Sequence, residues 1–178
     1  MSTFDAVVIS VSALSVFFDL KLRKIPNWLI LAGGIAGLTI NAMQGFTAFY
    51  SSVGGLTAGI AVLLIPFAFG WIGAGDVKFF GVVGALLGIT WLPRVFFYSA
   101  LVAGFIAVFY VVTGSARVAM KEIWTGFKLA LISFGRIMPE PVAIGHKASG
   151  RSVPWGVAFA IGTIIAYYID YNGNWAGF

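Results

Sequence analysis

Six apolar runs, separated by short turns, constrain this chain more than any other feature of its sequence. They cover residues 4–20, 28–43, 53–71, 77–92, 95–113 and 153–170. Only 10% of the 178 residues are charged, whereas soluble domains carry about a quarter. A soluble core cannot bury this much apolar surface, and water does not tolerate it exposed. We therefore predict an all-α polytopic membrane bundle of about six transmembrane helices, folded as a single domain over residues 1–178.

Local signals set the expected ends of these helices. Asp5 stands where a signal peptide would carry basic residues, so we expect the first run to be a retained span. Trp28 is expected to anchor the second run at the membrane interface. Pro66 is expected to interrupt the third run, and Pro93 with Arg94 to form a tight turn after the fourth.

Residues 115–152 differ in character, because basic residues enter an otherwise apolar chain. Arg117, Lys121 and Lys128 fall within one narrow stripe of a helix. Lys128, in the middle of the segment, argues against another crossing there. We predict that this segment is a cytoplasmic loop containing one amphipathic helix that lies in the membrane interface.

The distribution of positive charge predicts the topology. With six crossings, ten of the eleven basic residues fall on one side of the membrane, and only Arg94 falls on the other. Lys and Arg are enriched in cytoplasmic loops, which makes the basic side cytoplasmic and directs both chain ends outward. Topology then explains the formal charge of +5, with the lipid bilayer as partner of the basic helix. A nucleic-acid partner is not expected.

Glycines recur at four-residue spacing in several of the runs. Such patterns let helix backbones approach closely and favour a compact bundle; they are Gly33 with Gly37, Gly55 with Gly59, and Gly84 with Gly88. The chain has no cysteine and one histidine, His146. Disulfides, Cys-ligated zinc and thiol catalysis are therefore excluded within this sequence. We expect no metal and no cofactor.

Two carboxylates lie at the ends of apolar runs, on the side that the basic residues identify as cytoplasmic. Asp19 ends the first run, and Asp76 follows Gly73-Ala74-Gly75 before the fourth. Acids at a membrane boundary are candidates for function. Each has a simpler explanation: Asp19 can pair with Arg23 one helical turn away, and Asp76 can cap the fourth helix.

A pair of carboxylates can carry out acid/base hydrolysis. Two close carboxylates do not ionise together easily, so they share a proton. The ionised one can then take a proton from water, while the protonated one can hydrogen-bond the scissile carbonyl and later protonate the leaving amine. The pair titrates as a unit, so neither role is assigned to a single residue. A helix N-terminus at Asp76 would favour its charged form, which makes Asp76 only marginally the better base. Gly73 and Gly75 would allow positive φ, or close approach of a substrate backbone.

These residues carry a resemblance to a known family. Gly73-Ala74-Gly75-Asp76, with Lys78 following, resembles the G-x-G-D-x-K motif of type IV prepilin peptidases. Asp19, a basic cluster and Ile25-Pro26-Asn27 resemble the family's other aspartate segment. The stretch from Ser152 to Gly156 resembles the Pro-aromatic-Gly opening of its final span. The resemblance extends from about residue 10 to about residue 165.

The resemblance implies a specific activity. It predicts an aspartic endopeptidase of the prokaryotic inner membrane that removes the basic leader from prepilins or pilin-like proteins at the cytoplasmic face. Asp19 and Asp76 would be catalytic, and Gly73, Gly75 and Lys78 would bind substrate or shape the site. The chain is similar to the short peptidases of tight-adherence (Flp) pilus systems. It lacks the four zinc-binding cysteines associated with N-methylation in longer members, so methyltransferase activity is not expected.

Two other functions remain open from the sequence. The acids could bind ions or protons in a small transporter, although no internal repeat of the kind found in many transporters appears. The chain could also be a non-catalytic membrane scaffold. The remaining ionisable residues are not assigned to the site: Asp5, Glu122, Glu140, His146 and Asp170.

Overall fold

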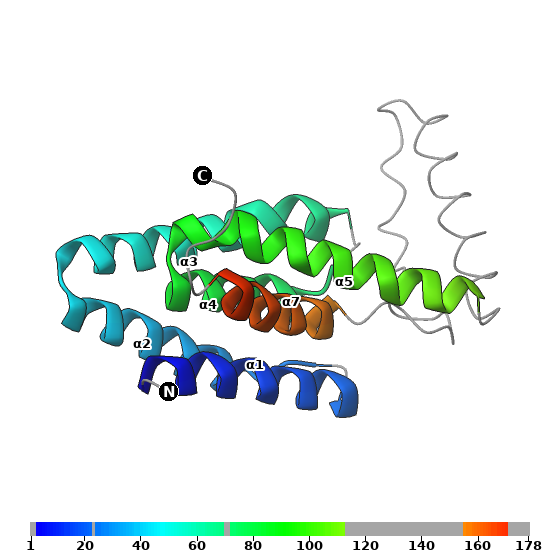
Figure 1. Ribbon diagram of the computed structural model, residues 1–178, viewed down its shortest axis with the longest axis horizontal. Helices are drawn as coiled ribbons and strands as arrows, with labels where there is room; N and C mark the ends of the chain where they lie inside the picture. The colour runs from blue at the N-terminus through cyan, green and yellow to red at the C-terminus, as the bar shows by residue number, and fades with distance from the viewer. Residues whose placement is uncertain (1–2, 23, 70–71, 113–154, 171–178) are drawn as a thin grey trace.

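The computed structural model describes residues 3–22, 24–69, 72–112 and 155–170. The regular elements of this part of the chain are all helical: α1 (Thr3–Leu22), α2 (Asn27–Gln44), α3 (Phe46–Ala68), α4 (Ala74–Leu87), the 3-10 turn η1 (Ile89–Trp91), α5 (Leu92–Val112) and α7 (Trp155–Asp170). The helices lie roughly along the long axis of the molecule (Figure 1). The all-α prediction is therefore confirmed for these residues. The interfacial helix predicted within residues 115–152 lies outside them.

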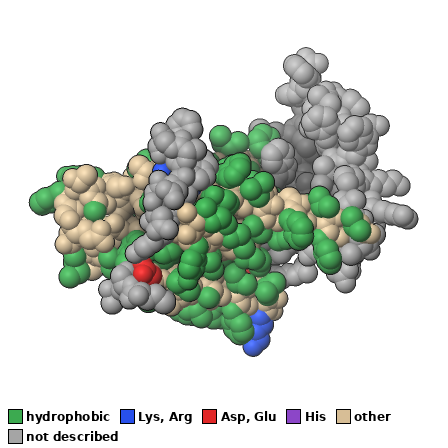
Figure 2. Space-filling view, in the orientation of Figure 1, with side chains coloured by type: hydrophobic (Ala, Val, Ile, Leu, Met, Phe, Trp, Pro, Cys, Tyr) green, Lys and Arg blue, Asp and Glu red, His purple; other side chains and the backbone are tan. Residues whose placement is uncertain are grey.

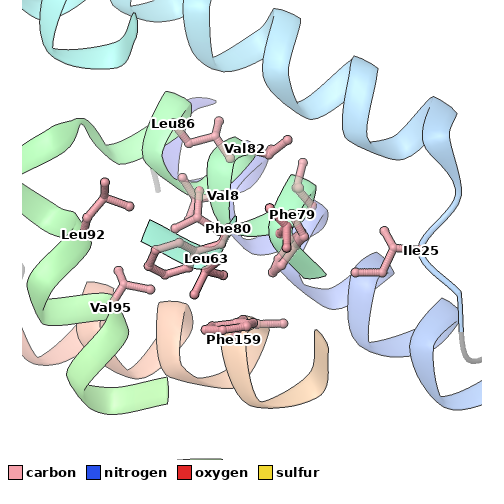
Figure 3. Packing of buried hydrophobic residues seen from close by; sticks show 14 of the residues in the cluster. Val8, Ile25, Leu63, Phe79, Phe80, Val82, Leu86, Leu92, Val95 and Phe159 are labelled. Carbon is pink, nitrogen blue, oxygen red and sulfur yellow. The ribbon is translucent and has the colours of Figure 1, made fainter. Parts of the chain in front are cut away.

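Helix α4 occupies the centre of the bundle. It contacts α2 and α3, and it also contacts α5 and α7. Every residue from 79 to 86 is buried, because α4 is apolar on all faces and is surrounded by other helices. The ring of Phe80 lies 5.1 Å from that of Phe159 in α7. Figure 3 shows these rings beside Leu63 of α3 and Val95 of α5.

Glycines allow α2 and α3 to pack so closely on α4 that no side chain separates the backbones. A Cβ atom added to Gly55 would overlap the carbonyl of Gly84, and one added to Gly84 would overlap the carbonyl of Gly55. A Cβ atom on Gly37 would come within 2.8 Å of the backbone of Ala85. The four-residue glycine spacing thus creates the surfaces on which the central helix packs.

The buried C-terminus of α4 receives hydrogen bonds from the two helices beside it. The Asn41 side chain donates to the carbonyl oxygens of Ala85 and Leu86, at 3.2 and 3.0 Å. The Ser52 hydroxyl also donates to Ala85. The last carbonyls of a helix have no partner within it, and water does not reach them here. Asn41 and Ser52 satisfy them instead.

Two helices end at glycines with positive φ. Gly45 (φ 124°) separates α2 from α3, and Gly88 (φ 90°) ends α4. Residues with a side chain seldom adopt these angles. Helix α3 consequently begins at Phe46, earlier than the predicted residue 53, and α4 ends at Leu87, earlier than the predicted residue 92.

The prolines have different roles from those predicted. Pro66 lies inside α3, which continues to Ala68, so the predicted interruption is wrong. A proline removes only its own N–H from the helical hydrogen bonds, and the helix ends soon after Pro66. Pro93 lies in the first turn of α5, where the missing N–H needs no partner. It begins a helix instead of forming the turn.

The outward surface of the described bundle is also apolar. Leu31 and Ile35 of α2, and Phe105 and Val108 of α5, are among its exposed side chains. Figure 2 shows hydrophobic side chains spread over the visible described surface. Two segments, Phe46–Ala68 and Ile89–Phe109, are long and apolar enough to cross a membrane. The shorter helix Trp155–Ile169 is apolar as well.

Candidate active site

Asp19 and Asp76 converge at Gly156, in the first turn of α7. A Cβ atom built on Gly156 would lie 2.7 Å from Oδ2 of Asp19 and 3.0 Å from Oδ1 of Asp76. Both carboxylates therefore face one small space beside the α7 backbone. The two acids are distant in sequence, and the fold brings them together.

Asp76 is fixed by the first turn of its own helix. It is the third residue of α4, and its Oδ2 accepts a hydrogen bond from the Gly73 N–H at 3.2 Å. A carboxylate at this position satisfies one of the free N–H groups at a helix start. The capping role considered for Asp76 is thus present, and its second oxygen, Oδ1, lies toward Gly156.

Asp19 is held by a different helix from the one that carries it. It lies in the last turn of α1, where the helix dipole disfavours a negative charge. Its Oδ2 accepts a hydrogen bond of 3.0 Å from the N–H of Val157 in the first turn of α7. This hydrogen bond fixes the direction of the Asp19 carboxylate.

Helices α1 and α7 run antiparallel. Asp19 meets the beginning of α7, whereas Asp5, near the start of α1, accepts a hydrogen bond from the Tyr167 hydroxyl near the end of α7. The Tyr167 ring contacts Trp91, and Arg94 lies over the Trp91 ring at 5.4 Å. Asp5 and Arg94 therefore lie at the end of the bundle opposite the aspartate pair.

The two sequence segments that carry the aspartates also contact each other. Lys78 donates a hydrogen bond of 3.3 Å to Oδ1 of Asn27 at the start of α2. Ile25 is buried and lies against Gly75. The link between α1 and α2 is thereby attached to the first turns of α4, which fixes the end of α1 near Asp76. Lys78 contributes to this attachment through its hydrogen bond to Asn27.

The glycines before Asp76 do not need positive φ. Gly73 has extended backbone angles (φ −76°, ψ 151°), and Gly75 is helical. The positive-φ glycines of the described chain are Gly45 and Gly88. The conformational role expected of Gly73 and Gly75 is therefore wrong, and their contact with substrate stays a prediction.

The pKa of Asp76 is raised above that of an ordinary aspartate. This residue precedes the expected span 77–92. Burial, and then the negative charge of Asp19, raise its pKa from 3.8 to about 7, although the Gly73 N–H acts in the opposite direction. The helix N-terminus was expected to favour the charged form of Asp76. Burial outweighs it, so Asp76 keeps its proton to a higher pH than an ordinary aspartate does.

Sequence reasoning missed two residues, Gly156 and Val157. The segment ending in Gly156 was recognised only as a resemblance, and no role was given to it. Nothing in an apolar run indicates which glycine lies beside a carboxylate and which lies beside another helix. Among the described residues, no group of three His, Cys, Asp or Glu side chains could hold a metal ion.

Comparisons with known proteins place the chain in a family. The chain is 29% identical over 125 residues to a prepilin leader peptidase/N-methyltransferase of Bacillus subtilis (strain 168), which covers 68% of this chain and 50% of that protein. The chain thus spans about half the length of this curated relative. No solved structure matches it. The model of the type IV leader peptidase family matches residues 6–108, more than half of the sequence and both aspartates, and the chain belongs to this family.

Proposed function

We propose that this protein is an aspartic endopeptidase that removes the leader peptide from prepilins or pilin-like proteins. The observation that carries the proposal is the convergence of Asp19 and Asp76 on one point beside Gly156. Membership of the type IV leader peptidase family supports the substrate class. The proposal covers peptide hydrolysis only.

The two carboxylates take opposite roles in the first half of the reaction. Ionised Asp19 accepts a proton from water as the water oxygen bonds to the scissile carbonyl carbon. Protonated Asp76 gives its proton to the carbonyl oxygen, which produces a neutral gem-diol. The hydrogen bond from Val157 to Asp19 and the raised pKa of Asp76 support this assignment.

The second half of the reaction restores the pair. The proton on Asp19 passes to the amide nitrogen as the carbon–nitrogen bond breaks, and a gem-diol hydroxyl returns a proton to Asp76. One water is consumed, and the products are a carboxylic acid and an amine. Because each carboxyl group regains its first state, the pair is ready for another turnover.

We further propose that the site faces the cytoplasm, at the boundary of a six-span bundle in a prokaryotic inner membrane. Lys21, Lys24 and Lys78 lie at the end of the described bundle that carries the aspartates, and Arg94 lies at the other end. This distribution supports the cytoplasmic orientation. The apolar outer surface supports a lipid environment.

Cleavage of a prepilin in liposomes tests the proposal. Asp19→Asn and Asp76→Asn should each lower the rate by at least about 100-fold, because each removes a proton donor or acceptor. Asp5→Asn is the matched control, since it changes an acid of α1 at the opposite end and keeps an acceptor for Tyr167. It should cleave at a rate near that of the parent. Parental activity in either of the first two variants would refute the aspartate mechanism.

A further inference from the structure

The absent side chain at Gly156 has a different consequence from the other close glycine contacts. At Gly55 and Gly162, an added Cβ atom would meet the backbone of a neighbouring helix. At Gly156, its nearest neighbours are Oδ2 and Cγ of Asp19 and Oδ1 of Asp76. A methyl group at position 156 would therefore meet the two carboxylates first.

The two carboxylates cannot turn away without losing their hydrogen bonds. Asp19 is held by the Val157 N–H at 3.0 Å, and Asp76 by the Gly73 N–H at 3.2 Å. Both donors are backbone groups at helix starts, so their positions are fixed by the helices. A side chain at Gly156 would break this arrangement or occupy the space between the carboxylates.

We propose that the first turn of α7 is the third wall of the aspartate site, with Gly156 as a positioning residue that reserves the space for water and the scissile carbonyl. Val157 completes this wall, because its N–H holds the Asp19 carboxylate toward that space. The inference rests on the proposed peptidase function and extends it. It assigns a role to a helix beyond residues 6–108, the part of the chain that the family model matches.

Kinetics of Gly156→Ala provide the first test. A small misplacement of catalytic groups costs about 100-fold in rate, so we expect kcat to fall by about that factor, with KM and the thermal midpoint near those of the parent. Gly104→Ala is the matched control, because nothing lies within 4 Å of a Cβ atom at Gly104. A parental kcat in Gly156→Ala would overturn the inference, as would a rise in KM alone.

A disulfide provides a second test that does not depend on activity. The chain contains no cysteine, so the pair Asp19→Cys and Gly156→Cys would be its only thiols. Cγ of Asp19 lies 2.9 Å from the Cβ position of Gly156, which is close enough for a disulfide. We expect rapid crosslinking under mild oxidation. The control pair Asp19→Cys and Gly162→Cys should not crosslink, because Gly162 lies against Ser99.

The two tests separate the possible failures. Parental cleavage of a prepilin without crosslinking in the first cysteine pair would overturn the inference and leave the proposed function standing. Crosslinking without any cleavage by the parent protein would refute the proposed function, and with it the positioning role of Gly156. Crosslinking, parental cleavage and a reduced kcat in Gly156→Ala together would establish both.

Discussion

The N–H of Val157 donates a hydrogen bond of 3.0 Å to Oδ2 of Asp19, a residue 138 positions earlier in the chain. This contact joins the start of α7 to the end of α1. It places a carboxylate at the favourable end of a helix dipole, although the helix that carries the carboxylate presents its unfavourable end. The orientation of the Asp19 carboxylate is therefore set by a helix that is remote in sequence.

Stability should depend on the ionisation of Asp76. Its pKa is about 7 in the folded protein and near 3.8 when unfolded, so the folded state binds the proton more tightly. This contribution to stability is complete below the unfolded pKa and is lost as the pH rises through the folded value. We expect the thermal midpoint in detergent to fall as the pH rises across this interval. Asp76→Asn, which is always neutral, should show a flatter profile; an unchanged slope would contradict the assignment.

Cleavage should also decline at alkaline pH. Above a pH of about 7, Asp76 loses the proton that it must give to the carbonyl oxygen. Rates measured across this range should fall on the alkaline side while the protein stays folded. A rate that keeps rising well above neutral pH would show that Asp76 does not act as the acid.

Gly55→Ala should weaken the packing of α3 on α4. The new methyl group would meet the carbonyl of Gly84, which is backbone and cannot move alone. We expect a loss of at least about 2 kcal/mol in the free energy of unfolding, measured by denaturant titration in detergent. Gly104→Ala should be neutral or slightly stabilising. Equal midpoints for the two variants would contradict the close approach.

Asn41→Leu should destabilise the bundle by about 1–3 kcal/mol. It removes the donor to the carbonyls of Ala85 and Leu86, which would remain buried without that partner. Thr57→Ala is the control, because the Thr57 hydroxyl is exposed and bonds only within its own helix. The same denaturant titration compares them, and a loss no greater than that in Thr57→Ala would rule out a capping role for Asn41.

Chelators should leave cleavage unchanged. The proposed reaction moves protons between two carboxyl groups and a water, and no step uses a metal. Incubation with EDTA followed by the prepilin assay tests this directly. Strong inhibition that is reversed by adding a divalent ion would replace the aspartate mechanism with a metal-dependent one.

Hydropathy located the helices well, because apolar runs of this length have few alternatives to helices in a lipid environment. It did not locate their ends. Gly45 and Gly88 end helices through positive φ, and neither differs in the sequence from glycines that pack inside helices. Pro66 and Pro93 were misjudged because the effect of a proline depends on its distance from a helix end, which hydropathy leaves undefined.

The pairing of Asp19 with Asp76 could be inferred from the sequence. The predicted topology places the end of the first span and the start of the fourth on the same side of the membrane. The centrality of α4 could not, because a helix that is apolar on all faces can lie either in the core or against lipid. The roles of Gly156 and Val157 were also hidden. Both roles depend on the backbone and not on a distinctive side chain. The N–H of Val157, for example, would be supplied by any residue other than proline.

The antiparallel pairing of α1 with α7 also affects the order in which the molecule becomes active. Asp19 and Asp76 both leave the ribosome before Gly156 and Val157. A nascent chain that still lacks α7 therefore contains both acids but not the Val157 N–H that orients Asp19. If the protein is the proposed peptidase, cleavage should therefore begin only after α7 has docked against α1.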